Sequence, residues 1–394
     1  MMKYVSIFIL LFSLAGCTIR NPKKLNWYKG NLHTHTYWSD GDEFPEMVLD
    51  WYKSNGYAFI ALSDHNTTAR DEKWIVIQKS PMYETGFQNY LDKFGKEWVQ
   101  YKSDTGRIQV KLKTFNEYRT KMSGENFLII PSEEITDRVG KKPVHINATN
   151  LQEFVPPSGD TTVAGTMQKT IDAVLKQRVQ TGIPMFPHIN HPNFGWGITL
   201  EEMISLKGEQ FFEVYNGHPM VHNYGDSAHI STETMWDKIN IAYAKRNQPL
   251  MFGLATDDSH NYHQFGGAFS NAGRGWVMVQ AESLSADALI TAMEAGKFYA
   301  TTGVALSDYS FDRDEIKIQV AEEKGIEYKI ELIGVRSGET AANVLQTVNG
   351  AEANFKVTSE FLFVRARISS TKSKPNPFQE GDFEMAWTQP VFKR

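Results

Sequence analysis

Two histidines one residue apart, His33 and His35, are the first residues of the chain whose types and spacing could do chemistry. They follow the apolar-leading run Gly30-Asn31-Leu32 and precede the turn signal Asp40-Gly41. Alternate side chains of an extended strand point to the same side, so both imidazoles would project together from one strand end. Paired neutral imidazoles suit a divalent transition metal, although two polar residues in a turn give the same short pattern.

Further apolar runs along the chain also end in histidine, aspartate or glutamate. These polar ends are Asp64-His65, Glu133-Glu134, His188–His191, Glu213–Asn216 and Asp257–His260, and His145 lies within one more short strand pattern. Histidines scattered by chance over a surface would not keep falling at strand ends. The sequence therefore predicts that several strands deliver metal ligands to one place.

Helical patterns alternate with these strands and must position them. They cover residues 45–55, 167–181, 200–206, 231–246 and 285–295. Alternating strands and helices predict a parallel sheet with crossover helices. About seven such units, with histidine, aspartate or glutamate at nearly every strand end, favour a closed barrel whose active site lies at the carboxyl ends of the strands. An open doubly wound sheet is the alternative, and it would gather its site at one switch point.

The ordered series H-x-H…S-D-G, D-H-N, P-S-E-E, V-H-I-N, N-H-P-N and D-D-S-H resembles the PHP (polymerase and histidinol phosphatase) superfamily over residues 29–303. The resemblance implies a distorted (β/α)7 barrel with a trinuclear site that hydrolyses phosphate esters. The three divalent ions would be Zn, Mn or Fe, and the nucleophile would be metal-bound hydroxide.

The resemblance also assigns the ligands of each ion. One ion would be held by His33, His35, Glu134 and Asp258, a second by Asp40, His65 and His260, and a third by Glu134, His145 and His191. Two doublets leave the register open, because Glu133 could replace Glu134 and Asp257 could replace Asp258. The small-x-Glu pattern of Ser132–Glu134 and the D-x-H spacing favour Glu134 and Asp258.

Other residues are candidates for catalysis and substrate binding. We expect Asp64, Glu134, Asp258 and His260 to take part in catalysis, with Asp64 or an unassigned histidine as a candidate general acid. Arg70, Arg274 and His218 are candidate substrate ligands, because arginine suits bidentate phosphate contacts and His218 belongs to a loop expected on the catalytic face. A surface position without such a role is the alternative for each of these three residues.

The N-terminal segment predicts where the protein works. Lys3 precedes an apolar run over residues 4–15, which has the length of a signal-peptide core and is too short to span a bilayer. The run ends in Leu14-Ala15-Gly16-Cys17, which resembles a bacterial lipoprotein signal, and Cys17 is the only cysteine. We therefore expect residues 1–17 to be the signal with lipid attachment at Cys17, and residues 18–28 to tether the protein to a membrane of the cell envelope, facing the periplasm.

The charge balance limits the class of substrate. The formal net charge of −5 offers no broad basic surface for a nucleic-acid duplex. A small phosphorylated molecule, such as a sugar phosphate or a nucleotide, fits better than a long polymer.

Two segments stand outside the alternating pattern. Residues 66–126 are long for a connection and contain helical patterns near 83–101 and 110–122, so we expect an insertion that caps the site. Residues 304–394 alternate apolar and polar residues over 316–320, 328–332 and 361–368 and contain the turn signal Asn349-Gly350. This part is expected to form a small antiparallel β-sandwich domain.

Two other functions compete with a phosphoesterase. An amidohydrolase-type metal hydrolase also uses H-x-H in a barrel, and an envelope lipoprotein could bind metal or carbohydrate without catalysis. A purely structural metal site needs about four ligands closed around one ion. The larger ligand set favours an enzyme, and the strand-borne glutamate together with D-x-H favours phosphate esters.

Overall fold

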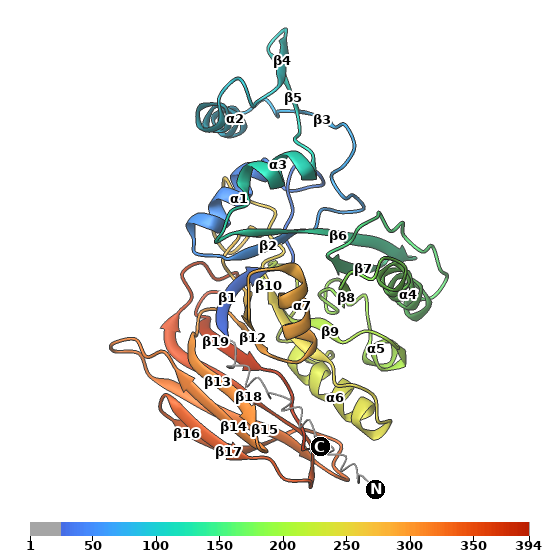
Figure 1. Ribbon diagram of the computed structural model, residues 1–394, viewed down its shortest axis with the longest axis vertical. Coiled ribbons are helices and arrows are strands. Elements are labelled where there is room, and N and C mark those ends of the chain that lie inside the picture. Colours follow the sequence, from blue (N-terminus) through green and yellow to red (C-terminus); the bar gives the residue numbers. More distant parts are fainter. Residues whose placement is uncertain (1–24, 394) are drawn as a thin grey trace, which may run out of the picture.

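The computed structural model describes residues 25–393 as a mixed α/β protein with one large sheet and two small ones (Figure 1). The expected signal peptide, Cys17 and most of the tether lie outside the described residues. Within residues 25–393, none of the helices has the length and apolarity needed to cross a membrane.

The large sheet has 13 strands in the order β10-β9-β8-β7-β6-β2-β1-β11-β12-β19-β18-β15-β16. Its strands are β1 (Asn26–Asn31), β2 (Phe59–Leu62), β6 (Leu128–Val139), β7 (Lys142–Thr149), β8 (Phe186–Ile189), β9 (Phe211–Asn216), β10 (Phe252–Thr256), β11 (Trp276–Ala281), β12 (Phe298–Thr301), β15 (Tyr328–Arg336), β16 (Asn343–Asn349), β18 (Phe361–Ser373) and β19 (Phe383–Thr388).

The expected parallel (β/α)7 barrel is correct only in part. Strands β1, β2 and β6 pair in parallel, as do β8, β9 and β10. However, β7 is antiparallel to both β6 and β8, and β11 is antiparallel to β1. Buried side chains of several of these strands, among them Phe59, Phe211 and Val277, share one core. Strand β10 is the edge of the sheet order, so strand pairing among the described residues does not close a barrel.

A tight hairpin joins β6 to β7, whereas two neighbouring parallel strands would need a crossover connection. Val139 pairs with Lys142, which leaves Gly140 and Lys141 as a two-residue turn between β6 and β7. Gly140 has a φ of 62°, which glycine adopts without the steric cost that a Cβ would bring. Because β7 runs back along β6, His145 near the start of β7 lies opposite Thr136 near the end of β6.

Seven helices connect the strands. They are α1 (Pro45–Ser54), α2 (Pro81–Phe94), α3 (Phe115–Met122), α4 (Val163–Thr181), α5 (Leu200–Ser205), α6 (Thr232–Lys245) and α7 (Ala286–Glu294) within the described residues. Serine or threonine side chains cap several helix N-termini, as Ser231 does for α6 and Ser285 for α7. The helices expected at 45–55, 200–206, 231–246 and 285–295 agree with these bounds to within a residue or so, whereas α4 begins earlier than expected.

The insertion at 66–126 contains α2, α3 and a small sheet of β3 (Trp74–Val76), β5 (Arg107–Lys111) and β4 (Tyr101–Asp104). The helical patterns therefore extended too far at both sites, because Tyr101 begins a strand and Val110 belongs to one. Thr105 and Gly106 join β4 to β5 with positive φ angles of 48° and 77°, as a tight hairpin requires.

This insertion packs on α1 at the end of the molecule opposite the C-terminal strands (Figure 1). Glu46 of α1 accepts hydrogen bonds from Tyr90 (2.8 Å) and from Trp98 (2.6 Å). Trp38 Nε1 donates to the carbonyl of Lys113 at 3.0 Å. The insertion thereby supports the segment that carries Asp40.

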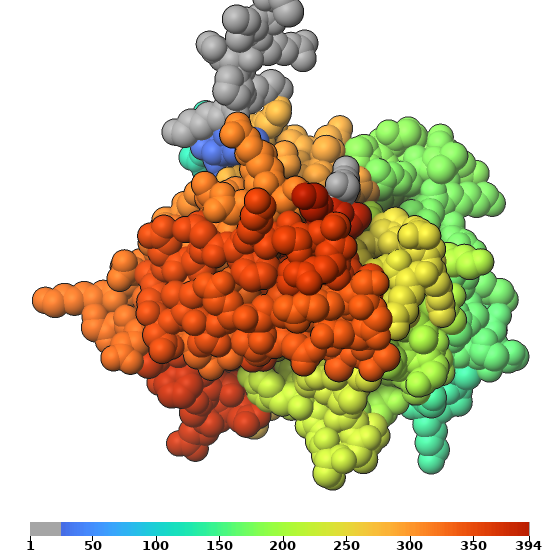
Figure 2. All heavy atoms as spheres, turned by 90° about the horizontal axis from the view of Figure 1, so that it is seen from below, coloured from blue at the N-terminus to red at the C-terminus, as the bar shows by residue number. Residues whose placement is uncertain are grey.

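Residues after 305 gather on one face of the molecule (Figure 2). Strands β13 (Leu306–Asp312), β14 (Glu315–Val320) and β17 (Glu352–Lys356) form a separate antiparallel sheet. Ile316 and Ile318 of that sheet share a core with Ile330 and Ile368 of β15 and β18. Strand β19 pairs with both β12 and β18. The predicted separate sandwich is therefore not confirmed, because its strands continue the large sheet.

Candidate metal centre

His33 and His35 lie just beyond the end of β1, inside the protein, with their Nε2 atoms 3.1 Å apart. Asp258 Oδ1, beyond the end of β10, lies 3.2 Å from each of these nitrogens. Glu134 Oε2 on β6 lies 3.4 Å from His33 Nε2 and 3.2 Å from His35 Nε2. Four ligand atoms from three segments therefore face one buried point.

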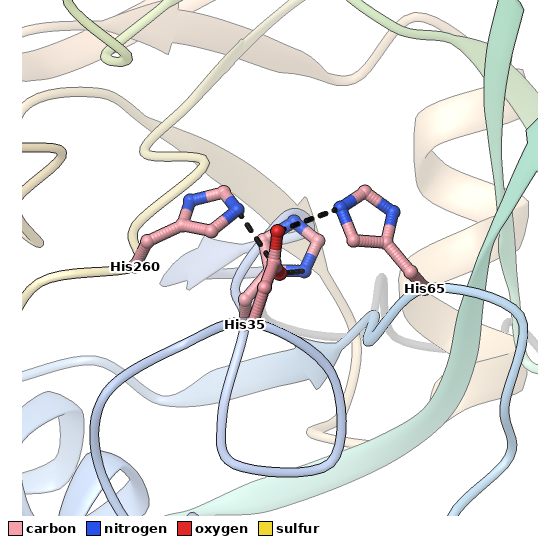
Figure 3. Close-up of side chains that lie close together, drawn as sticks. His35, His65 and His260 are labelled. Atoms are coloured by element: carbon pink, nitrogen blue, oxygen red, sulfur yellow. Dashed lines mark ion pairs between the residues drawn. The ribbon is translucent and has the colours of Figure 1, made fainter. Parts of the chain in front are cut away.

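Asp40 brings together a second group of imidazoles, those of His35, His65 and His260, whose rings converge in Figure 3. Its Oδ1 lies 3.3 Å from His260 Nε2 and 3.6 Å from His35 Nδ1. Its Oδ2 lies 3.4 Å from His65 Nε2. The Asp40 side chain is 57% exposed, so this second group forms the open side of the centre.

Glu134 is the carboxylate that the groups share. Its Oε1 lies 3.0 Å from His145 Nδ1 and 3.5 Å from His191 Nε2. Its Oε2 lies 2.8 Å from His65 Nδ1, in addition to the two contacts with His33 and His35. Because the two oxygens face different imidazoles and the side chain is 1% exposed, Glu134 is a buried carboxylate common to two of the groups that could hold a metal ion.

Two of these residues have backbone conformations that are costly for residues with a Cβ. The φ angle is 50° at Asp258 and 22° at His191. Hydrogen bonds hold both conformations, since Asp258 N donates to the His33 carbonyl at 3.0 Å and His191 N donates to Glu213 Oε2 at 2.8 Å. Such local strain is frequent at functional sites.

The electrostatics of the centre are set by its concentrated charges. Burial disfavours the charged form of His33, but nearby carboxylates, above all Asp258 and Glu134, outweigh burial and hold the pKa of His33 well above its ordinary value. Burial also opposes ionisation of Glu134, yet the histidines, led by His65, hold its pKa well below its ordinary value. The carboxylates are thus ionised and available as ligands near neutral pH.

The residues present fit divalent ions. Glu134 Oε2 is buried and makes no hydrogen bond within residues 25–393. Donor atoms within 4.8 Å of one another form five groups: His35, Asp40, His65 and His260; His33, His35 and Glu134; His33, His191 and Asp258; His33, His188 and Glu213; and His65, Glu134 and His145. Imidazole together with carboxylate suits Zn, Mn or Fe.

In each doublet, the two neighbouring carboxylates point in different directions. Glu133 lies on the other face of β6 and accepts a hydrogen bond from Val155 N at 3.1 Å, and burial raises its pKa to about 8. Asp257 accepts hydrogen bonds from Tyr52 Oη (2.7 Å) and from Arg274 N (2.6 Å). The structure therefore places Glu134 and Asp258 beside the histidines, and it places Glu133 and Asp257 in supporting hydrogen-bond networks.

Asp64 holds the segment that presents Asp40. It is 3% exposed, and its carboxylate accepts hydrogen bonds from Thr36 N (2.8 Å), Thr36 Oγ1 (2.8 Å) and Ser39 Oγ (2.7 Å). These contacts occupy both carboxylate oxygens. Its geometry is that of a residue that positions Asp40, and the general-acid role expected for it stays a prediction.

The three candidate substrate ligands lie in different surroundings. Arg274 is buried, and its guanidinium donates to the carbonyls of Gly217, Gly266, Phe269 and Asn376. Arg70 lies 4.0 Å from Glu153 with 39% of its side chain exposed. Only His218 is close to the centre, with its ring centroid 5.5 Å from that of His260, and burial lowers its pKa to about 4.

Sequence reasoning missed the residues that orient the ligands. Glu213 Oε1 accepts a hydrogen bond from His33 Nδ1 at 2.7 Å, and Asn190 Nδ2 donates to Glu134 Oε1 at 2.8 Å. His188 is fully buried, with Nε2 3.6 Å from Glu213 Oε1. Glu213, Asn190 and His188 all lie in polar runs at strand ends. Their spacing in the sequence does not distinguish residues that orient ligands from the ligands themselves or from core residues.

Comparison with known proteins gives a likeness in structure only. No protein-family model and no curated protein matches the chain. A two-domain protein from Bacteroides vulgatus, described as containing a predicted PHP-like metal-dependent phosphoesterase, is 15% identical with a TM-score of 0.43, covering 95% of this chain and 100% of its own.

Two further solved structures are similar over part of the chain. A protein from Bifidobacterium adolescentis, described as a metal-dependent phosphoesterase, is 12% identical with a TM-score of 0.30, over 60% of this chain and 88% of its own. An amidohydrolase from Chromobacterium violaceum is 14% identical with a TM-score of 0.29, over 59% of this chain and 87% of its own. At these values the likeness does not decide the activity of this chain.

Proposed function

We propose that this protein is a metal-dependent hydrolase of phosphate esters that acts on a small phosphorylated substrate through three divalent ions. The observation that carries the proposal is the position of Glu134, a buried carboxylate that faces His33 and His35 on one side and His145 and His191 on another. A single structural ion would not need ligands arranged on several sides of one carboxylate.

When bound, the ions would lower the pKa of a water and neutralise the charge that develops on the phosphate oxygens. The protein's own residues position this chemistry. Glu134 holds neighbouring ligand groups together, and Asp40 together with His260 forms the side that is open to a substrate. The open side gives a phosphate group access to the centre.

His218 is placed to contact a substrate oxygen at this open side. Met220 N donates a hydrogen bond to His218 Nδ1 at 3.1 Å, so neutral His218 carries its proton on Nε2. The ring lies beside Phe194, with centroids 5.9 Å apart, and beside His260. Its Nε2–H would donate a hydrogen bond to a substrate oxygen and orient the ester.

Metal content and phosphatase activity test the proposal together. Purified residues 18–394 should contain two to three transition-metal ions per chain by elemental analysis and should hydrolyse p-nitrophenyl phosphate or its bis-ester. A chelator should abolish activity, and Zn, Mn or Fe should restore it. Comparing the two substrates separates a monoesterase from a diesterase.

Matched variants connect the activity to the centre. Glu134→Ala should lose both activity and bound metal, whereas Glu201→Ala, at an exposed position in α5, should keep both. A protein that stays fully active after complete metal removal would overturn the proposal.

We further propose that the chain works at the cell envelope, anchored through lipid at Cys17, as the lipoprotein-like signal in residues 1–17 suggests. The full-length chain expressed in a bacterium should fractionate with membranes, and Cys17→Ser should move it to the soluble fraction. Continued membrane association of Cys17→Ser would contradict the lipid anchor.

A further inference from the structure

One face of the β6–β7 hairpin extends from the candidate metal centre to the tip of the hairpin. Residues at alternate positions of a strand, and residues directly opposite in an antiparallel pair, lie on the same face of the sheet. Glu134, Thr136 and Arg138 alternate along β6, and Thr136 pairs with His145 while Arg138 pairs with Pro143. This face therefore carries Glu134 and His145 at the centre and Arg138 at the tip of the hairpin.

A pocket of about 370 Å³ occupies this face. It is lined by Thr136, Asp137, Arg138, Lys141, Pro143 and His145. His145 forms its inner end and lies 3.0 Å from Glu134 Oε1. Thr136 Oγ1 lies 2.5 Å from His65 Nδ1. The pocket is thus continuous with the candidate ligands of the centre.

Two cations at the outer end of this pocket have no acidic partner. Arg138 and Lys141 are exposed, and neither makes an ion pair within residues 25–393, whereas the adjacent Lys142 lies 3.6 Å from Glu202 Oε1. An unpaired arginine and an unpaired lysine within one pocket attract an anion.

The carboxylate of Asp137, which lines the same pocket, offsets at most one of these two positive charges. Its Oδ1 accepts a hydrogen bond from Arg138 N at 2.7 Å, and its Oδ2 accepts one from Gly159 N at 2.8 Å. Backbone N–H groups therefore engage both oxygens. With two cations, Arg138 and Lys141, against one carboxylate, the lining residues still carry an excess of one positive charge.

We propose that Arg138 and Lys141 bind a second anionic group of the substrate while its phosphate ester lies at the metal centre. This inference rests on the proposed phosphoesterase function and narrows its substrate class to small molecules with anionic groups at two ends. At about 3.4 Å per residue, the Cα atoms of Glu134 and Arg138 lie roughly 14 Å apart along β6, and both side chains can reach into that interval. A molecule of this kind spans the pocket, whereas a simple phosphate monoester leaves its outer end unused.

Three synthetic substrates test the second anionic group and its chemistry. Phenyl phosphate has none, 4-carboxyphenyl phosphate has a carboxylate, and 1,4-phenylene bisphosphate has a second phosphate. The wild-type protein should show higher kcat/KM for the two-ended substrates, and the better of the two identifies the preferred anion. In the double variant Arg138→Ala/Lys141→Ala, the ratio of kcat/KM between a two-ended substrate and phenyl phosphate should fall about tenfold or more.

Lys142→Ala is the matched control, because Lys142 neighbours Lys141 in sequence but does not line the pocket. This control should leave the ratio unchanged. An unchanged ratio in the double variant would overturn the second anionic site while leaving the phosphoesterase function intact.

Binding of inorganic pyrophosphate to the chelator-treated protein tests the pocket without catalysis. Titration calorimetry at low salt should give a dissociation constant that rises about tenfold in the double variant and stays constant in Lys142→Ala. If no phosphate ester is cleaved but this difference persists, the anion site stands and the proposed function fails. Equal pyrophosphate affinity in the wild type and the double variant would refute the anion site.

Discussion

His33 donates the hydrogen of Nδ1 to Oε1 of Glu213 at 2.7 Å, and its Nε2 faces Asp258 and Glu134. Glu213 is fully buried, and burial opposes its ionisation, yet the neighbouring imidazoles, led by His33, hold its pKa well below its ordinary value. Its other oxygen accepts hydrogen bonds from His191 N and from Asn216 Nδ2, each at 2.8 Å. One carboxylate thus fixes the tautomer of one candidate ligand and the backbone of another.

Glu213→Gln should weaken metal binding at the ion that faces His33 about 10- to 100-fold, because partners of this kind orient the ligating imidazole. Competition with a chromophoric chelator measures the dissociation constant. Glu201→Gln, at an exposed position of α5, is the control and should behave as wild type. Unchanged metal affinity in Glu213→Gln would show that the hydrogen bond does not orient His33.

Asp257→Asn and Asp258→Asn should affect different properties. Asp257 accepts hydrogen bonds from Tyr52 Oη and from the backbone N–H groups of 273, 274 and 275. The NH2 group of an asparagine at this position would face these donors and could not accept their hydrogen bonds. We expect Asp257→Asn to lower the free energy of unfolding of the metal-free protein by about 2–4 kcal/mol.

Asp258→Asn should instead reduce bound metal and cause the smaller loss of stability of the two. Urea unfolding after chelation, combined with elemental analysis before it, separates these outcomes. The register assigned to the doublet fails if Asp257→Asn is the variant that loses metal.

Arg274→Ala should destabilise the protein by about 3 kcal/mol or more, because it leaves the buried carbonyl of Gly217 and three partly buried carbonyls without their donor. Arg70→Ala is the comparison and should change the free energy of unfolding by less than about 0.5 kcal/mol, since its ion pair is long and exposed. Urea unfolding measures both. A stable Arg274→Ala protein with a raised KM would instead support the substrate-binding role expected from the sequence.

Glu209 should make stability fall as pH rises. Burial raises its pKa to about 7, and Tyr243 Oη donates a hydrogen bond to it. Since the unfolded chain releases this proton near its ordinary pKa of 4.5, the folded state binds more protons between about pH 4.5 and 7. The contribution of Glu209 to the free energy of unfolding is therefore fully present below about pH 4.5 and is lost as the pH rises through about 7.

Urea unfolding at pH 5 and pH 8 measures this contribution, and Glu209→Gln should reduce the difference between the two pH values by about 1–3 kcal/mol. The remaining pH dependence of the variant comes from other groups. A difference that is the same in wild type and variant would place the titration elsewhere.

Residue spacing predicted which segments meet at the centre because most of the candidate ligands follow an apolar strand run, although Glu134 lies within β6 and His145 within β7. His33, His65 and Asp258 come directly after β1, β2 and β10, where the strands end at one side of the sheet. The helices α1, α6 and α7 were also predictable, since their apolar faces repeat with helical spacing and serine caps two of them.

The direction of β7 and the roles of Glu213 and Arg274 were not predictable. The turn at Gly140 and Lys141 is too short to show in an apolar pattern, and it reverses a strand that was expected to be parallel. Glu213 and Arg274 act through partners that are distant in sequence, and residue type alone does not reveal whether a buried charge contacts a ligand, a carbonyl or a substrate.

The place of β19 in the large sheet has a consequence for how the two ends of the sheet are joined. Strand β19 lies between β12 and β18, and the Gln389 side chain beyond it both accepts from Gly253 N and donates to Gly253 O in β10. The strands that carry the candidate ligands, from β10 to β1, pair with one another without β19, whereas β18, β15 and β16 join the sheet by strand pairing among the described residues only through β19. Loss of the pairing of β19 with β12 would therefore detach β19 and these three strands from the large sheet and leave the ligand-bearing strands paired.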